Sequence, residues 1–70
     1  MHTQELLNQA KELRRLMSQA ATIVEGMQAK LPELEEPAMS AQCSVIRHFI
    51  RQTERQEELL KDMLTAKMAS

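Results

Sequence analysis

The chain has 70 residues, of which 43% are hydrophobic and 27% charged, with a formal net charge of −1 and a single aromatic residue, Phe49. This length fits one folding unit. The near-neutral charge argues against bulk attraction to nucleic acid or acidic lipid, and the lack of Tyr and Trp argues against a base-stacking platform for single strands. No apolar run approaches the ~20 residues of a membrane span.

The single cysteine, Cys43, excludes an internal disulfide and fits a reducing compartment. The N-terminal segment carries Gln4, Glu5, Asn8 and Lys11 where a signal peptide would need a continuous apolar run. We therefore expect a soluble, cytoplasmic protein without membrane contact. Chains this small usually need a disulfide, a metal or a partner subunit for stability. With neither a disulfide nor a His/Cys cluster, we expect a partner chain.

A heptad pattern in the first half of the chain predicts a helix over about 3–30. Thr3 is a candidate N-cap, and Gly26 is the one weak helix former, which could mark a close backbone approach. Apolar residues recur at alternating spacings of four and three, so we expect one stripe to press against a second helix. The stripe comprises Leu6, Ala10, Leu13, Met17, Ala20, Val24, Met27 and Leu31.

Two prolines bound the predicted connector, residues 31–37. A residue that precedes proline is disfavoured in the α region, so Pro32 ends the first helix, and Pro37 suits the first turn of the next. The segment between them is acidic and contains one apolar residue, Leu34, which we expect to fold back over the end of the helices.

A second helix is predicted over about 38–67. If Ile46 and Leu60 share one heptad position, then Thr53 shares it too, and Gln56 falls at the other core position. Two explanations stay open for these polar residues. They can form a layer that fixes register, or they can flank a gap that a different protein fills.

The predicted fold is all-α: residues 1–70 form a single two-helix antiparallel hairpin. Leu7, Leu16, Ala21 and Ile23 widen the first helix's apolar stripe beyond what one neighbouring helix covers. We therefore expect dimerisation into a four-helix bundle, with another helical protein as the alternative partner. The expected interface residues are Leu6, Leu13, Leu16, Met17, Ala20, Ile23, Val24, Ile46, Phe49, Ile50, Leu60 and Met63.

No catalytic, cofactor or metal site is expected, so the sequence does not predict an enzyme. Cys43 and His48 are five residues apart, which turns their side chains about 140° from each other on a helix. No third group orients His48, and a cysteine on an apolar face is most often a small buried hydrophobe. His2 and His48 lie far apart in a hairpin and cannot share a metal ion.

The sharpest polar pattern is Arg47, Arg51 and Arg55, at intervals of four residues along one helix face. Such a stripe could follow phosphates, although nearby glutamates dilute its field. In helix layout and length, without a shared residue motif, the architecture resembles the Rop family of RNA-binding plasmid regulators and the helical-hairpin co-chaperones of bacterial secretion systems.

The sequence therefore favours a self-associating protein–protein interaction module, serving as an adaptor, chaperone-like subunit or regulatory cofactor. A nucleic-acid-binding regulator that uses Arg47, Arg51 and Arg55 is the alternative. Methionines on or beside the apolar faces fit either core filling or an adaptable docking surface.

Overall fold

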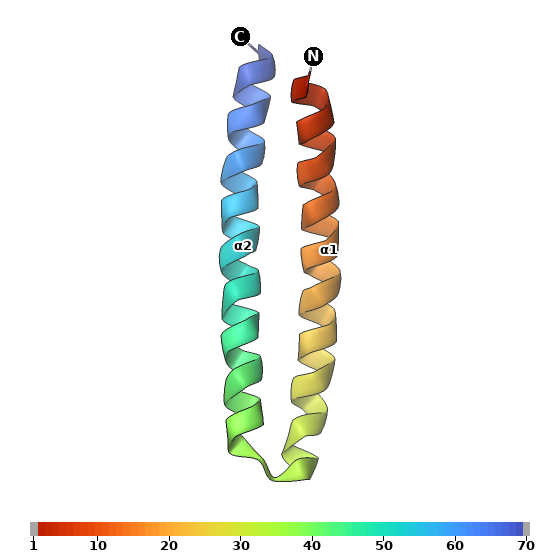
Figure 1. Cartoon of the computed structure of the whole chain (residues 1–70), viewed down its shortest axis with the longest axis vertical. Helices are drawn as coiled ribbons and strands as arrows, with labels where there is room; N and C mark the ends of the chain where they lie inside the picture. Colours follow the sequence, from red (N-terminus) through yellow and green to blue (C-terminus); the bar gives the residue numbers. More distant parts are fainter. Residues whose placement is uncertain (1, 70) are drawn as a thin grey trace.

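The computed structural model describes residues 2–69 and shows two long helices lying side by side (Figure 1). α1 (His2–Lys30) and α2 (Pro37–Ala69) run antiparallel, and a short 3-10 helix, η1 (Leu31–Leu34), leads into the turn between them. The two chain ends lie at one end of the rod and the connector lies at the other. The predicted helical hairpin is confirmed. Because α1 begins at His2, Thr3 lies inside its first turn and is not the N-cap.

The connector is held by backbone hydrogen bonds. Glu35 adopts a left-handed conformation with φ of 54°, and its N–H donates to the carbonyl oxygen of Pro32 at 3.2 Å. Pro37 is the first residue of α2, as expected of a residue with fixed φ and no N–H to satisfy. The expected position of Leu34 is wrong, because the 3-10 turn brings Leu31 back against the helices and leaves Leu34 60% exposed.

α1 faces α2 with a stripe that is rotated from the predicted one. Ala10, Met17, Val24 and Leu31 are buried or half-buried as predicted. The other heptad position of the contact is filled by residues one further along the chain than predicted. These residues are Leu7, Arg14, Ala21 and Gln28, in place of Leu6, Leu13 and Met27, whereas Ala20 is half-buried beside Ala21.

The predicted heptad phase of α2 is wrong. Cys43, Ile50 and Glu57 are the buried residues of this helix. The half-buried residues beside them at the same spacing are Ser40, Arg47, Glu54, Lys61 and Leu64. Among the predicted core positions Thr53 alone is half-buried, and the exposed ones are Ile46, Leu60, Lys67, Phe49, Gln56 and Met63.

Polar pairs also join the two helices in this rotated arrangement. The amide of Gln28 donates to the hydroxyl of Ser44 at 3.1 Å, and Arg47 lies 3.9 Å from a carboxylate oxygen of Glu25. In this arrangement each helix turns its predicted apolar stripe to one side of the hairpin contact. The contact is therefore part polar, and the most apolar stripes remain outside it.

The resulting core is thin. Val24, Cys43 and Ile50 form the buried cluster, with Met17 and Leu31 among the half-buried residues that pack on it. The Cα trace measures 54 × 14 × 12 Å and has a radius of gyration of 16.1 Å. A compact domain of this length has a radius of gyration of about 11 Å. The hairpin is a rod with few buried residues, so any binding function must use side chains on its outer faces.

Candidate interaction surface

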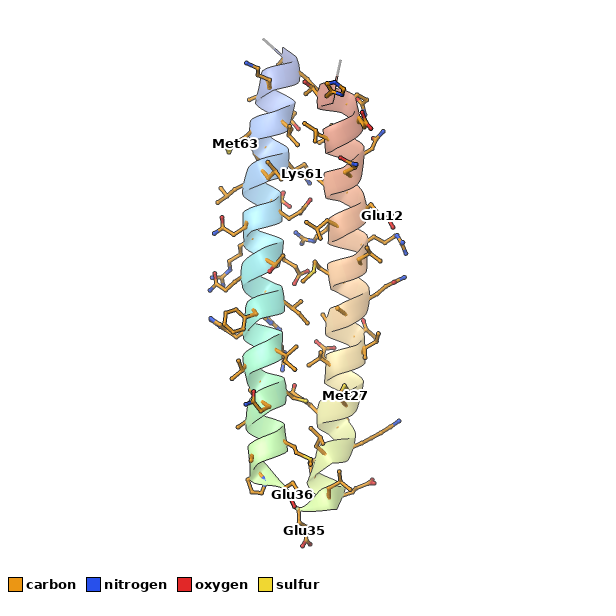
Figure 2. The ribbon with its side chains drawn as sticks, in the orientation of Figure 1. Glu12, Met27, Glu35, Glu36, Lys61 and Met63 are labelled. Carbon is orange, nitrogen blue, oxygen red and sulfur yellow. The ribbon has the colours of Figure 1, made fainter. Side chains whose placement is uncertain are left out.

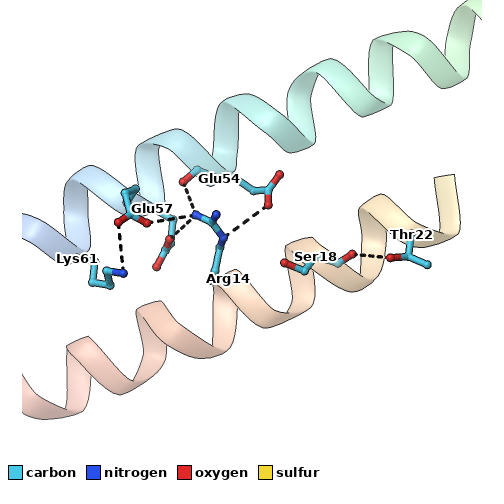
Figure 3. Close-up of polar contacts among 7 residues, drawn as sticks. Arg14, Ser18, Thr22, Glu54, Glu57 and Lys61 are labelled. Atoms are coloured by element: carbon cyan, nitrogen blue, oxygen red, sulfur yellow. Dashed lines mark hydrogen bonds and ion pairs between the residues drawn. The ribbon is translucent and has the colours of Figure 1, made fainter. Parts of the chain in front are cut away.

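A polar layer interrupts the hairpin contact at Arg14. The Nη1 of its guanidinium donates to the Oε2 of Glu57 at 3.3 Å, to the Oε2 of Glu58 at 3.4 Å and to the backbone carbonyl of Glu54 at 3.3 Å. Figure 3 shows Arg14 reaching across from α1 to α2. One cation from α1 therefore meets three glutamates of α2, and the layer ties the two helices in a single register.

Glu57 is the buried member of this layer. Its side chain is 1% exposed, whereas that of Arg14 is 43% exposed. Oε1 of Glu57 has no hydrogen-bond partner among the described residues. A buried carboxylate with one satisfied oxygen is costly, so the arginine is essential to holding Glu57 in the contact.

One face of the hairpin is open and apolar. We call it the open face. It consists of two columns at heptad spacing, one on each helix, that flank the hairpin contact. The α1 column is Leu6, Leu13, Ala20 and Met27, and the α2 column is Met39, Ile46, Thr53, Leu60 and Lys67. The large apolar members are between 39% and 49% exposed. Such a stripe is typical of a helix that packs against a further helix.

Two apolar grooves place the columns on the same face. Leu6 and Leu13 line a groove of about 240 Å³ together with Leu60 and Leu64 of α2, near the chain ends. Near the connector, a groove of about 370 Å³ is lined by residues of both helices, namely Met27, Leu31, Ala38, Met39, Gln42, Cys43 and Ile46. Because each groove draws its lining from both helices, the two columns lie on the same side of the hairpin at both ends of the rod.

The sequence-predicted interface residues fall into two groups. Val24 and Ile50 are buried within the hairpin, and Met17 and Ala20 are half-buried against the same core. The others are exposed on the hairpin, and Phe49 and Ile23 are 63% and Met63 70% exposed. The exposed group is Leu6, Leu13, Leu16, Ile23, Ile46, Phe49, Leu60 and Met63. Figure 2 shows Met63 pointing away from α1.

The prediction missed the polar members of the contact, Arg14 and Glu57, and placed Leu7 beside the core and not in it. Leu7 and Arg14 lie three residues before Ala10 and Met17, so the two share one heptad position. Because Arg14 is charged, a pattern of apolar residues does not include it. The one available signal was that three glutamates of the second helix fall opposite Arg14 in a hairpin of these lengths.

The three arginines of the predicted stripe have different neighbours in the structure. Arg47 is half-buried and paired with Glu25. Arg51 and Arg55 line a groove of about 320 Å³ together with Arg14, Glu54 and Glu58. The glutamates in and beside this groove balance its arginines, so it offers no strong positive field.

Cys43 and His48 lie in different environments. Cys43 is a free thiol in the apolar cluster, 4% exposed, as expected of a small buried hydrophobe. His48 is exposed, and its ring packs edge-on against Phe49 with 5.8 Å between centroids. Within residues 2–69, no three His, Cys, Asp or Glu side chains gather where they could hold a metal ion.

Comparisons with known proteins return nothing: no family model matches the chain, and neither curated proteins nor solved structures give a significant match. Neither α1 nor α2, over the described residues, is apolar enough along its length to span a membrane. The geometry of the open face therefore carries the functional argument.

Proposed function

We propose that this protein is a small helical protein–protein interaction module that self-associates through the open face, forming a four-helix bundle. In that role it acts as an adaptor, a chaperone-like subunit or a regulatory cofactor. The observation that carries the proposal is the pair of apolar columns, with Leu13, Ile46 and Leu60 each about two-fifths or more exposed on the same side of the hairpin. Contiguous exposed apolar surface on this scale marks an interaction site.

The exposed area supports a partner of substantial size. The hairpin exposes 5521 Å², whereas a compact monomer of 8.0 kDa exposes about 4,450 Å². The excess of roughly 1,000 Å² exceeds the ~800 Å² that each partner contributes to a standard interface. A second hairpin on the open face would remove this excess.

The nucleic-acid alternative has weaker support. Arg47 is paired with Glu25, which leaves a shorter stripe, and Arg51 and Arg55 share their groove with Glu54 and Glu58. To bind phosphate, these arginines would have to interact more favourably with phosphate than with the glutamates beside them. The large apolar side chains of the open face, in contrast, remain 39–49% exposed among the described residues.

Self-association is tested by sedimentation velocity and by thermal unfolding over a hundredfold range of protein concentration. A dimer unfolds at a midpoint that rises with concentration. Leu60→Glu places a charge on the open face and should yield a monomer. Leu59→Glu is the matched control, because this exposed leucine is turned about 100° away, and it should remain dimeric.

A folded wild-type monomer at low micromolar concentration, with a midpoint unchanged on dilution, contradicts the proposal. Equal dissociation by both leucine variants would move the interface away from the open face.

A further inference from the structure

The open face is nearly symmetric about its own middle. Cross-helix contacts set the level of each residue, since Glu25 lies across from Arg47 and Gln28 from Ser44. At this pairing, Ala20 lies level with residue 52, next to Thr53. Both columns therefore have a small side chain at mid-length and larger ones seven residues to either side, which are Leu13 and Met27 on α1 and Ile46 and Leu60 on α2.

Small residues at mid-length suit two hairpins that cross there. Packed helices of a bundle cross at about 20°, approach most closely at the crossing point and diverge towards their ends. Ala20 and Thr53 allow that approach, and the larger side chains fill the widening gap on either side.

Charge distinguishes the two ways in which a second copy could lie on this face. The connector carries Glu33, Glu35 and Glu36 and no basic residue, and Figure 2 shows Glu35 and Glu36 at the tip of the hairpin. A parallel arrangement brings the two acidic connectors together, and like charges placed side by side are unfavourable. An antiparallel arrangement keeps the two acidic connectors apart and places each beside the partner's chain ends, which carry charges of both signs, including Glu5, Asp62 and Lys67.

We propose that the occupant of the open face is a second copy of this chain in the antiparallel orientation. The two-fold axis lies between the two open faces, parallel to them and perpendicular to the rod, at the level of Ala20 and Thr53. This inference rests on the proposed self-association and adds its geometry.

The symmetry relates residues that are equally far from Thr53 along the rod. Ile46 of one copy then lies level with the partner's Leu60. Met27 lies level with the groove near the partner's chain ends, which Leu60 also lines. The side chains that line the groove near the connector thus enter the partner's groove lined by Leu6, Leu13, Leu60 and Leu64. Methionine suits this contact because it adapts to irregular neighbours.

The orientation is tested by spin-label distance measurement on the full chain. Cys43→Ala removes the native thiol, and Ala41→Cys then carries one label. Ala41 is exposed and lines neither apolar groove. In the antiparallel dimer the two labels lie about 36 Å apart along the rod, because residue 41 falls level with residue 65 of the partner at 1.5 Å per residue. In a parallel dimer the same labels lie at one level and much closer.

A second sample mixes this protein with one labelled through Ala66→Cys, an exposed position at the opposite end of α2. The antiparallel dimer brings the unlike labels to within about two residues of the same level. A short distance between Ala41 labels overturns the antiparallel geometry while leaving self-association intact. The absence of any distance between chains, in a protein that circular dichroism shows to be helical, overturns self-association as well.

Discussion

The guanidinium of Arg14 lies 3.3 Å from the Oε2 of Glu57, and this pair joins the two helices within a contact whose buried apolar cluster is Val24, Cys43 and Ile50. Leu7 and Ala10 lie on the chain-end side of the pair, and Val24, Cys43 and Ile50 lie on its connector side. The pair thus divides the hairpin core into two apolar parts. Moving one helix past the other by a turn would leave the Glu57 carboxylate buried without a cation.

Arg14→Met should lower the free energy of unfolding by about 2–4 kcal/mol, because it leaves the Glu57 carboxylate buried and unpaired. The double variant Arg14→Met, Glu57→Leu should recover the loss, since it removes the buried charge together with its partner. Arg15→Met is the control. It breaks only an exposed pair with Glu12 and should change stability by less than ~1 kcal/mol. Urea unfolding at one protein concentration gives these values. If Arg14→Met has the same free energy of unfolding as the wild type, the Glu57 side chain must instead point into solvent.

Ile50→Ala should lower the free energy of unfolding by about 2–4 kcal/mol, because it opens a cavity in the cluster with Val24 and Cys43. His48→Ala, two residues away on the exposed side of α2, should stay within about 0.5 kcal/mol of wild type. The same urea experiment compares the two. Similar losses at both positions would contradict the rotated heptad phase of α2.

Gly26→Ala should raise the free energy of unfolding by about 0.5–1 kcal/mol. Gly26 lies within α1, and a Cβ atom at this position would meet nothing within 4 Å, so the expectation that Gly26 marks a close backbone approach is wrong. Alanine restricts the unfolded chain more than glycine and is the better helix former. Gln19→Gly, at an exposed position of the same helix, should lose stability. If Gly26→Ala is destabilising instead, another chain approaches α1 at this point.

Glu12 should titrate at lower pH than an ordinary glutamate. A side-chain hydrogen bond from Arg15 lowers the pKa of Glu12 from its usual 4.5, opposed by desolvation and aided by the arginine's charge. The charged carboxylate is favoured in the folded helix, so the pair's contribution to stability is present above pH 4.5 and disappears as the pH falls through the lowered pKa. Carboxyl ¹³C chemical shifts measure the titration. Arg15→Gln should raise the midpoint and Lys11→Gln should leave it unchanged, and equal effects would assign the shift to net charge.

The helices and the turn followed from the sequence because their signals are local. Heptad spacing over Leu6 to Leu31 required a helix, and Pro32 and Pro37 set the bounds of the connector. The helix rotation did not follow, because a periodicity argument assigns the most apolar stripe to the nearest available helix. In this hairpin the nearest helix meets a part-polar stripe that includes Arg14 and Glu57. A hydrophobic pattern reports that a face will be buried, and a further chain can bury it as well as the same chain can.

The last prediction concerns Thr53 and Gln56, which the sequence placed in the hairpin core and the structure places elsewhere. Thr53 is half-buried at the middle of the α2 column, and Gln56 is exposed beside it. Thr53→Ile with Gln56→Leu therefore enlarges the open face and, in the proposed dimer, fills the point at which the two copies would approach most closely. We expect stronger self-association and a broader distribution of oligomers, because the small residue at the crossing point has been replaced. Sedimentation velocity over a concentration series measures both. Arg55→Leu, on the charged side of α2, should keep the wild-type distribution. A double variant that remains a dimer of one size would instead indicate that Thr53 and Gln56 border a gap that another protein fills.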